Sequence, residues 1–517
     1  MLSYAEIGLA TTVLGSSLYL FLREQAAKCL LPPSPPGAYP LIGHALVLPT
    51  ERQHIVYDRW SKELNSDIIS LTPVGRTIII LNSVDAATEL LDRRARIYSD
   101  RPRLRVMVDP DLLDWGKGTG SSPYGVRWKK LRRITHEALK PSTNAHNFAL
   151  FEKETYAMLK RLVVNPEAFG IEFHLPTYKC VSRTVAGEIL STAYGYTVED
   201  AHDTLVTDNV KAIAIFSLAA IPGNFMVNFI PWLKCVPDWF PGTQWKRKIK
   251  EWRQLKERIS SVPYNWTKAQ IASGRAAPSM IKTYLASLDD DPQVDIADEE
   301  DHLMWATATL FSASSDTTHA SLMSFVLAMV RHPEIQTRAQ EEIDRVTNSE
   351  RLPKITDRDS MPYVQCIVQE VLRWQPPLPL GFPHSTTEDD EYNGYSIPKG
   401  SIVMANIWAM SRDESVYKFS ETFNPGRFLS TDTPSAPVFG FGRRACPGNH
   451  YAETSLFIMF ASMLAVFDMR PKIDPATGKE EMPEVKVTLN ALISHIFPFE
   501  CSIKPRSDVH KELIKSI

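Results

Sequence analysis

The stretch FGFGRRACPGNH, residues 439–450, holds the cysteine with the clearest chemical potential, Cys446. A buried structural cysteine needs neither the glycines and arginines before it nor the Pro-Gly after it. A thiolate acts as a nucleophile or as a metal ligand, and both roles require that its charge be stabilised. His450 would lie on a helix that leads away from the sulfur, and no other Cys or His has zinc-site spacing. The chain also lacks HExxH, GxSxG and P-loop motifs, so hydrolase and nucleotide-binding functions have no support.

A sole thiolate ligand suits haem iron, because the porphyrin supplies four nitrogens and the protein one axial group. The neighbours fit this role. Gly442 allows a tight backbone turn beneath a flat ring. Pro447 has no N–H and Gly448 has no side chain, so nearby amides can approach the sulfur. Phe439 can shield the sulfur, and Arg444 can pair with a propionate carboxylate.

The spacing of these residues resembles the haem-binding signature of the cytochrome P450 family. Five positions carry the resemblance: Phe439, Gly442, Arg444, Cys446 and Gly448. The resemblance implies that haem b (heme b, iron protoporphyrin IX) is the cofactor and that Cys446 is its metal ligand.

Two further motifs match the same family in the same order. EVLR places Glu370 and Arg373 three residues apart on one helix face, which favours an ion pair. In FNPGRF, Arg427 stands about where the family has the third member of a Glu-Arg-Arg cluster. The resemblance implies a structural lock behind the haem, with a role in folding and cofactor retention rather than in chemistry.

Two other motifs resemble propionate contacts of the family. RWKKLRR supplies Trp128 and Arg132 on one helix face, within reach of a propionate. His384 in GFPH matches a further propionate contact, although an ordinary loop histidine is nearly as good an interpretation.

The segment ASSDTT, residues 313–318, resembles the family's oxygen-activating motif. Splitting dioxygen requires two protons in order, and Asp316 and Thr317 supply an acid and a hydroxyl. The alternative for Thr317 is a hydroxyl bonded back to a helix carbonyl. Ser314 stands where the family usually has glycine, and we expect its hydroxyl to bond the carbonyl of Leu310 and bend the helix.

The hydrophobic pattern predicts more helices than strands. A hairpin is expected over 67–83, where β-branched residues flank Pro73–Gly75. The longest helix is expected over 295–332, with acidic residues at its start, proline after its end and apolar residues nearly all round. Further helices are expected around 85–97, 124–139, 145–163, 173–191, 333–346, 359–374 and 447–467, and strands near 392–410 and 485–505.

The chain of 517 residues is 44% hydrophobic and has no internal linker or repeat, which favours one large domain. The resemblance implies a cytochrome P450 fold, mostly α with small β-sheets. The net charge of -3 argues against nucleic acid as a partner. Six scattered cysteines without a CxxC pair indicate reduced thiols rather than a disulfide framework.

The amino terminus contains an uncharged run from Ile7 to Leu22, close to the length that crosses a bilayer. A signal peptide is the alternative, but no basic region precedes the run. Arg23 and Lys28 follow it and favour a cytoplasmic side downstream. We therefore expect an anchor at 1–28, a proline-rich hinge at 29–44 and a catalytic domain at 45–517, cytosolic on the endoplasmic reticulum membrane. The apolar segment 225–242 is either a loop folded onto the core or a surface that dips into the membrane.

The resemblance implies a monooxygenase that inserts one oxygen atom from O2 into a C–H bond. Because the chain has no flavin or nicotinamide motif, electrons must come from outside, from an NADPH–cytochrome P450 reductase. Candidates for the docking face are basic residues, which are as often only solubilising: Lys129, Lys130, Arg133 and Arg443.

By analogy the substrate pocket would be apolar, so a lipophilic small molecule is expected; ordinary core is the alternative. Its expected lining is Met107, Val108, Leu112, Leu113, Trp115, Ala313, Leu378, Leu380, Phe382, Ile493 and Phe497. The phrases PYGVRWKKLRR and FIPWLKCVPDWFPG resemble fungal members, many of which oxidise terpenoids or polyketides in secondary metabolism. Two alternatives stay open: a haem-thiolate enzyme that rearranges peroxides or reduces a small gas, and a non-catalytic haem carrier or sensor.

Overall fold

The computed structural model describes residues 31–164, 179–199, 203–288, 295–488 and 491–516. The predicted anchor at 1–28 lies outside these residues. Within the described part of the chain, no helix combines the length and apolar composition needed to span a membrane.

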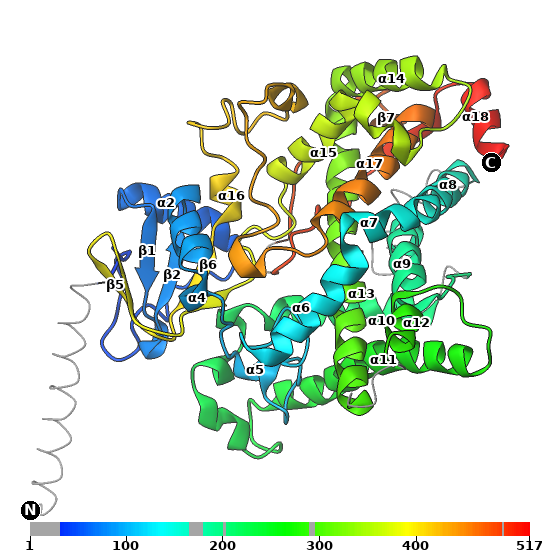
Figure 1. Cartoon of the computed structure of the whole chain (residues 1–517). Coiled ribbons are helices and arrows are strands. Elements are labelled where there is room, and N and C mark those ends of the chain that lie inside the picture. Colours follow the sequence, from blue (N-terminus) through cyan, green and yellow to red (C-terminus); the bar gives the residue numbers. More distant parts are fainter. Residues whose placement is uncertain (1–30, 165–178, 200–202, 289–294, 489–490, 517) are drawn as a thin grey trace, which may run out of the picture.

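The helix α13 (Ile296–Arg331) is the central element and runs through the middle of the helical part (Figure 1). Asp295 caps its start by accepting hydrogen bonds from the amides of Ala297 and Asp298. The helix ends at His332, directly before Pro333. Most residues from His302 to Val330 are buried, because other helices pack around this part of α13.

The other helices precede and follow α13 in the sequence. The longer ones are α2 (Gln53–Glu63), α6 (Val126–Leu139), α8 (Phe148–Val164), α9 (Lys179–Tyr194), α10 (Thr204–Ala219), α11 (Gln244–Ala272), α12 (Met280–Ala286), α14 (Pro333–Thr347), α15 (Pro362–Trp374), α17 (Asn449–Val466) and α18 (Asp508–Lys515). Short helices are α3 (Val84–Ala87), α4 (Ala95–Tyr98), α5 (Arg105–Val108), α7 (Pro141–Asn144) and α16 (Ile407–Met410).

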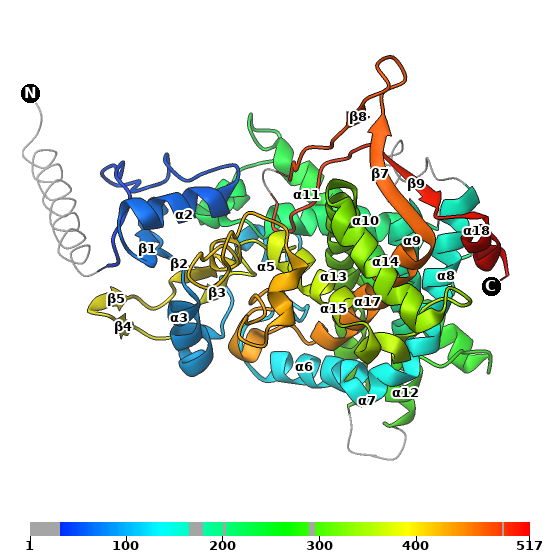
Figure 2. The ribbon, with the colours of Figure 1, turned by 90° about the horizontal axis from the view of Figure 1, so that it is seen from above.

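The strands form small sheets at the two ends of the molecule, with helices between them (Figure 2). The largest has the order β1-β2-β6-β3, in which β6 is parallel to β2 and the other pairs are antiparallel. Its strands are β1 (Ile68–Leu71), β2 (Ile78–Leu81), β6 (Ile402–Ala405) and β3 (His384–Ser385). The others are the hairpin of β4 (Asp390–Tyr392) and β5 (Tyr395–Ile397), and β7 (Phe467–Ile473) between β8 (Glu480–Glu481) and β9 (Cys501–Pro505).

The proline-rich segment is bonded to β1 where the structure describes it. The carbonyl of Pro33 accepts a hydrogen bond from the Ser70 amide at 2.9 Å, and the Pro32 carbonyl accepts one from the Ser70 hydroxyl at 2.6 Å. His44 bonds both the Pro35 carbonyl and Thr72. The described part of this segment is therefore fastened to β1 and to Thr72 by hydrogen bonds.

The predictions of a mostly helical chain, a hairpin over 67–83 and a long buried helix over 295–332 are confirmed. The helix predicted over 85–97 is divided, because a π-helical turn, η2 (Thr88–Arg93), separates α3 from α4. Two strand predictions are wrong in part. Residues 407–410 form α16. Among the described residues of 485–500, only a single bridge, Val487 to Ile496, precedes β9, because Ile493 and Ser494 donate to Ser217 and Pro377 instead of to a partner strand.

The predicted Glu-Arg-Arg residues meet in the core and tie α15 to the 3-10 turn η9 (Pro425–Leu429). Glu370 and Arg373 are both fully buried, and two hydrogen bonds of 2.7 and 2.8 Å join their side chains. Nε of Arg427 donates to the same carboxylate at 3.2 Å, and the Asn424 amide donates at 2.7 Å. One buried carboxylate thus balances two guanidinium groups from segments distant in sequence.

Replacing Glu370 with Gln should lower the free energy of unfolding by about 3–5 kcal/mol, because two guanidinium groups lose their counter-charge in the core. The matched control is Glu512→Gln, which breaks an exposed i,i+3 pair with Lys515 and should cost less than about 1 kcal/mol. Denaturant unfolding of both variants measures the difference. Equal costs would show that the buried cluster does not stabilise the fold.

Candidate active site

Cys446 lies between the 3-10 turn η10 (Gly442–Arg444) and the start of α17. Its amide donates to the Phe439 carbonyl at 2.8 Å, which closes the loop around the sulfur. The Gly448 amide points at Sγ, with 3.4 Å between nitrogen and sulfur. The prediction that backbone amides approach the sulfur is confirmed.

The sulfur of Cys446 faces an internal hollow. The cysteine is exposed by its surface area. Burial nevertheless raises the pKa of its thiol, and the Gly448 amide and the charge of Arg132 only partly lower that pKa again. Both observations hold when protein atoms surround the sulfur at a distance but leave its own surface uncovered. Such a sulfur would be able to hold the iron of a haem group.

Gly442 is fixed by the approach of the η2 turn. Its φ is +58°, in the left-handed region, and a Cβ atom there would lie 2.1 Å from the carbonyl oxygen of Leu91. Any side chain would therefore push this turn away from the cysteine loop. Gly448 is less restricted, because a Cβ atom would meet only Leu139 and the Cys446 sulfur at ordinary contact distances.

Three arginines and one histidine, buried or half-buried, lie near this loop. Burial lowers the pKa of Arg132. Burial also lowers the pKa of Arg444, and the positive charge of Arg132 acts in the same direction, so that this pKa is about 10. Arg101 and His384 both have pKa values well below their usual range, from burial and from neighbouring arginines. Asp100 is the carboxylate that offsets the charges of Arg101 and Arg444.

The polar contacts of these residues differ. Arg444 donates to the carbonyls of Ser99, Thr119 and Ser122, and its guanidinium lies 4.5 Å from the ring centroid of Trp128. His384 donates through Nδ1 to the Tyr98 carbonyl at 2.8 Å. The side chain of Arg132, on α6, forms no hydrogen bond or ion pair with the residues that the structure describes.

These contacts fit haem b. A dianionic group with two carboxylates would supply the charge that this cluster of cations lacks, and Arg132 retains its full set of donors for it. The sequence did not single out Arg101, which donates to the carbonyls of Gly120, Phe382 and Pro383. Its only sequence signal is its place in the polar stretch SDRPR.

Within the buried middle of α13, the least buried window is Ser312–Ser314, at the start of the ASSDTT motif. Ala313 is exposed between the half-buried Ser312 and Ser314, so the packing around the helix is open at this point. Ser314 donates to the Leu310 carbonyl at 2.6 Å, which confirms the predicted hydrogen bond, and the helix continues without a break. Thr317 donates to the Ala313 carbonyl at 2.9 Å, the back-bonded alternative considered from the sequence.

Asp316 has a partner that sequence analysis missed. Nε2 of His495 donates to its Oδ2 at 3.0 Å, and the ring of His319 lies 6.1 Å from that of His495. His319 could have been noticed, because it lies three residues after Asp316 on one helix face. His495 carries no such signal, since it lies in a loop distant in sequence.

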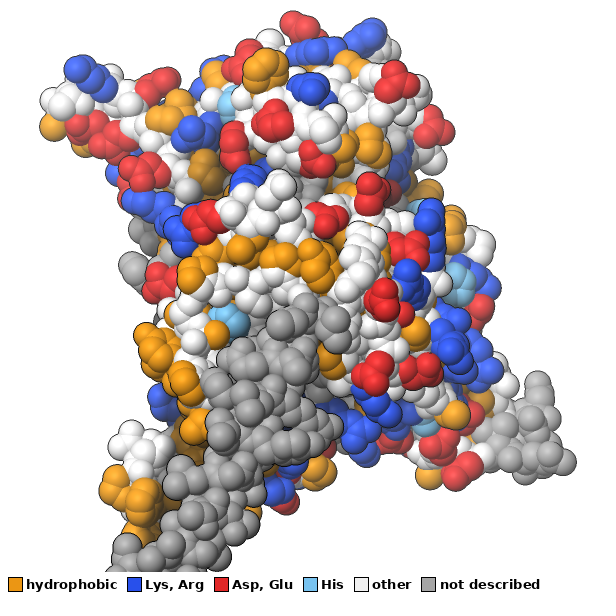
Figure 3. Space-filling view, turned by 90° about the vertical axis from the view of Figure 1, so that its left-hand side faces the viewer, with side chains coloured by type: hydrophobic (Ala, Val, Ile, Leu, Met, Phe, Trp, Pro, Cys, Tyr) orange, Lys and Arg blue, Asp and Glu red, His pale blue; other side chains and the backbone are white. Residues whose placement is uncertain are grey.

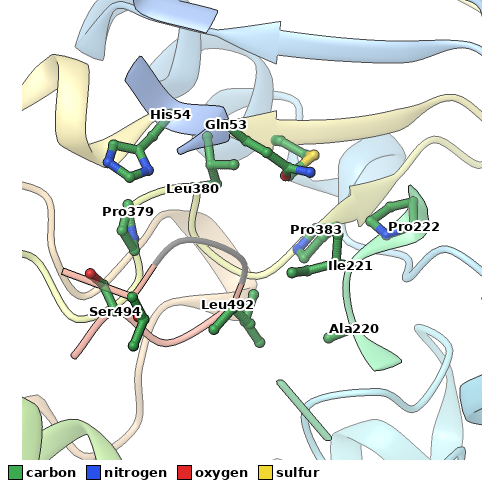
Figure 4. A pocket seen from close by; sticks show the side chains of 13 residues that line it. Gln53, His54, Ala220, Ile221, Pro222, Pro379, Leu380, Pro383, Leu492 and Ser494 are labelled. Carbon is green, nitrogen blue, oxygen red and sulfur yellow. The ribbon is translucent and has the colours of Figure 1, made fainter. Parts of the chain in front are cut away.

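Two cavities border the predicted pocket segments. The first lies between α2, the end of α10, the 379–383 segment and the 488–494 loop (Figure 4). Leu380 lines it, and Met107 and Phe382 line the second. The other predicted pocket residues are distributed differently. Three of them, Leu112, Leu113 and Trp115, are buried in the main core, and Val108 packs against that core. Leu378 and Ile493 pack on Ala320 of α13. Phe497 is exposed.

The features of this site together define a haem-thiolate oxidoreductase. Comparison with known proteins agrees. The family model described as Cytochrome P450 matches residues 32–495. Cytochrome P450 monooxygenase 208 of Postia placenta is 37% identical, over 99% of this chain and 97% of its own. Cytochrome P450 monooxygenase COX2 of Coprinopsis cinerea is 36% identical over 98% and 95%, and claR of Ampulloclitocybe clavipes 36% identical over 97% and 91%.

The chain belongs to the cytochrome P450 family. It is a monooxygenase, an oxidoreductase that uses haem b, and its fold is the mostly helical, single-domain fold of that family.

Gly442→Ala should disrupt the cysteine loop, because the added methyl group meets the Leu91 carbonyl as well as a left-handed φ. Gly440→Ala is the matched control: its φ is +74°, but nothing lies within 4 Å of the added atom. The control should cost only about 1–2 kcal/mol of backbone strain. We expect Gly442→Ala to bind much less haem per protein, measured by absorbance, and to unfold at a lower temperature. Equal haem content in both variants would contradict this account of the loop.

Proposed function

We propose that this protein hydroxylates or similarly oxidises a lipophilic small molecule, a terpenoid or polyketide intermediate of fungal secondary metabolism. The observation that carries the proposal is the Cys446 sulfur, uncovered in an internal hollow with the Gly448 amide directed at it. The fungal relatives, each named a cytochrome P450 monooxygenase, support the organism class. The apolar segments around the hollow support a lipophilic substrate.

Haem b, when bound, supplies the iron at which dioxygen is split, one atom entering the substrate and the other leaving as water. In our proposal Cys446 holds that iron as a thiolate, tempered by the Gly448 amide. Trp128, Arg132, Arg444 and His384 hold the propionates, and Phe439, Gly442 and Gly448 shape the loop. Asp316 and Thr317 move the two protons, and Glu370, Arg373 and Arg427 lock the fold behind the site.

We propose that electrons arrive from an NADPH–cytochrome P450 reductase at the face that carries Lys129 and Arg443. Both side chains lie over the ring of Tyr124, at 5.7 and 5.4 Å from its centroid, so their charges are close together. Arg133 is exposed as well. Lys130 is a weaker candidate, because Asp298 and Glu299 each bind its Nζ at 2.7 Å and balance its charge.

We also propose that residues 1–28 anchor the chain in the endoplasmic reticulum membrane, that 29–44 connect the anchor to β1, and that 45–517 form the cytosolic catalytic domain. On the face shown in Figure 3, charged side chains are frequent in the upper part, while hydrophobic side chains gather along the middle and lower left. Trp232 and Trp239, 65% and 80% exposed, supply amphipathic rings for a membrane surface.

Cys446→Ser tests the central assignment. In the reduced, carbon-monoxide-bound wild type, thiolate ligation predicts a strongly red-shifted Soret band, and the variant should lose it. Cys366→Ser is the control, because that thiol is buried elsewhere in the core and should leave the band unchanged. A normal Soret band in the wild type would contradict the haem-thiolate site.

Thr317→Ala tests the role of the hydroxyl. We expect product per NADPH to fall by about tenfold or more, and hydrogen peroxide to rise, because a proton no longer reaches its target in time. A panel of lipophilic reporter substrates with a purified reductase measures both. Thr307→Ala removes a hydroxyl bonded back to the Leu303 carbonyl of the same helix and should change neither. Unchanged product in Thr317→Ala would favour a purely structural hydroxyl.

A further inference from the structure

The ion pair between Asp316 and His495 joins α13 to the loop before β9. Asp316 is 10% exposed at its side chain and His495 is 16% exposed, with 3.0 Å between Oδ2 and Nε2. Between Asp301 and Arg331, Asp316 is the only acidic residue of a helix that is otherwise apolar, hydroxylic or histidine. A carboxylate placed there alone would be costly, so the fold must supply its partner.

The loop that carries His495 is held in place by its backbone. The His495 amide donates to Oγ1 of Thr488 at 3.1 Å, and the Thr488 amide donates to the His495 carbonyl at 2.9 Å. The Ser494 amide donates to the Pro377 carbonyl, and the Ile493 amide donates to Oγ of Ser217. The imidazole therefore meets Asp316 from a rigid support.

The electrostatics of the pair favour the charged form of both partners. Burial alone would raise the pKa of Asp316, but the charge and hydrogen bond of His495 bring it below its usual value. Burial alone would lower the pKa of His495, and Asp316 more than offsets this, so it is raised. Burial and the charge of His495 lower the pKa of His319 to about 3, so His319 is neutral.

We propose that His495 is the positioning residue that keeps Asp316 ionised next to Thr317 and supplies it with protons. This inference rests on the proposed function, because Asp316 acts as the acid there. An isolated buried Asp316 would be a neutral acid, able to give its proton once but slow to regain it. Paired with an imidazolium, it starts as a carboxylate and receives each proton from His495 when one is needed.

The proton transfer is balanced within the pair. The proton on Nε2 of His495 passes to Oδ2 of Asp316, which leaves a neutral imidazole and a neutral carboxyl group. Asp316 then gives its proton towards Thr317 and is again a carboxylate, and the imidazole takes a proton from water. Thr488 and Ser494, the hydrogen-bond partner and the chain neighbour of His495, line the cavity in Figure 4, and in our proposal water reaches this loop through that cavity.

The test is the protonation state of Asp316, read by infrared difference spectroscopy on the haem-loaded enzyme without substrate. In the wild type at mildly acidic pH, Asp316 should show no carbonyl stretch of a protonated carboxyl group. In His495→Gln, which keeps a hydrogen-bond donor but no charge, burial should raise the pKa of Asp316 and the band should appear. Its loss in the double variant with Asp316→Asn assigns it.

Two further variants separate proton supply from packing. His495→Lys keeps a cation, so the carboxyl band should stay absent. His302→Gln is the matched control. His302 is a buried histidine of α13, the helix that carries Asp316, and its Nδ1 donates to the Asp298 carbonyl. This variant should leave the Asp316 spectrum unchanged. The absence of the band in His495→Gln would overturn the proposal, even if that variant were less stable.

The pH dependence of coupling, measured as product formed per NADPH consumed, gives a second test. In the wild type, product per NADPH should fall as pH rises through the raised pKa of His495, because the imidazolium is lost. The fall should move to higher pH in His495→Lys, and His495→Gln should be poorly coupled, by about tenfold, at every pH. A profile identical to wild type in His495→Gln would also overturn the inference. If the wild type lacks the red-shifted Soret band, the proposed function fails instead, so the two failures are distinguishable.

Discussion

The burial of one ionisable sulfur is the constraint on which the rest of the site depends. A thiolate in a protein interior is stable only where donors and positive charge surround it, and the chain provides both through the Gly448 amide and Arg132. The Gly448 amide can reach the sulfur only from a tight loop, which is why Gly442 lies against the Leu91 carbonyl. The positive charge comes from the guanidinium of Arg132 on the helix α6. That guanidinium must itself lose water, which the lowered pKa of Arg132 reflects.

A second constraint follows from the helix that faces this loop. Most of α13 is apolar, yet oxygen chemistry needs polar atoms near its middle. The helix reconciles these demands by bonding hydroxyls to its own carbonyls, as Ser314, Ser315 and Thr317 do, which buries them at little cost. A carboxylate cannot be satisfied this way, because it has no hydrogen to donate to a carbonyl. Asp316 therefore depends on another segment of the chain, and the 488–497 loop provides that partner.

Features encoded by short-range spacing could be predicted from the sequence. The cysteine loop, the hydrogen bond from Ser314 to Leu310, and the helix over 295–332 each follow from residues near one another in the chain. Long-range pairs could not be predicted in the same way. The contact between Asp316 and His495 crosses 179 positions, and nothing in the pattern of 485–505 marks a histidine that turns inward. The π-helical turn η2 escaped prediction because its residues have an ordinary helical pattern.

The failed strand prediction over 485–500 and the missed His495 have a common cause. β-branched and apolar residues form a strand only when a partner strand offers a row of hydrogen bonds, and β9 finds one in β7 from Cys501 onward. Before Cys501, the amides bond to irregular partners instead: the Pro377 carbonyl, the Ser217 hydroxyl and Thr488. An extended strand would alternate its side chains between two faces and would fix His495 by its position in that alternation. Ile493 and His495, two positions apart, do share the face that meets α13, at Ala320 and Asp316, but irregular hydrogen bonds rather than a strand partner set that face, so no pattern in the sequence could indicate it.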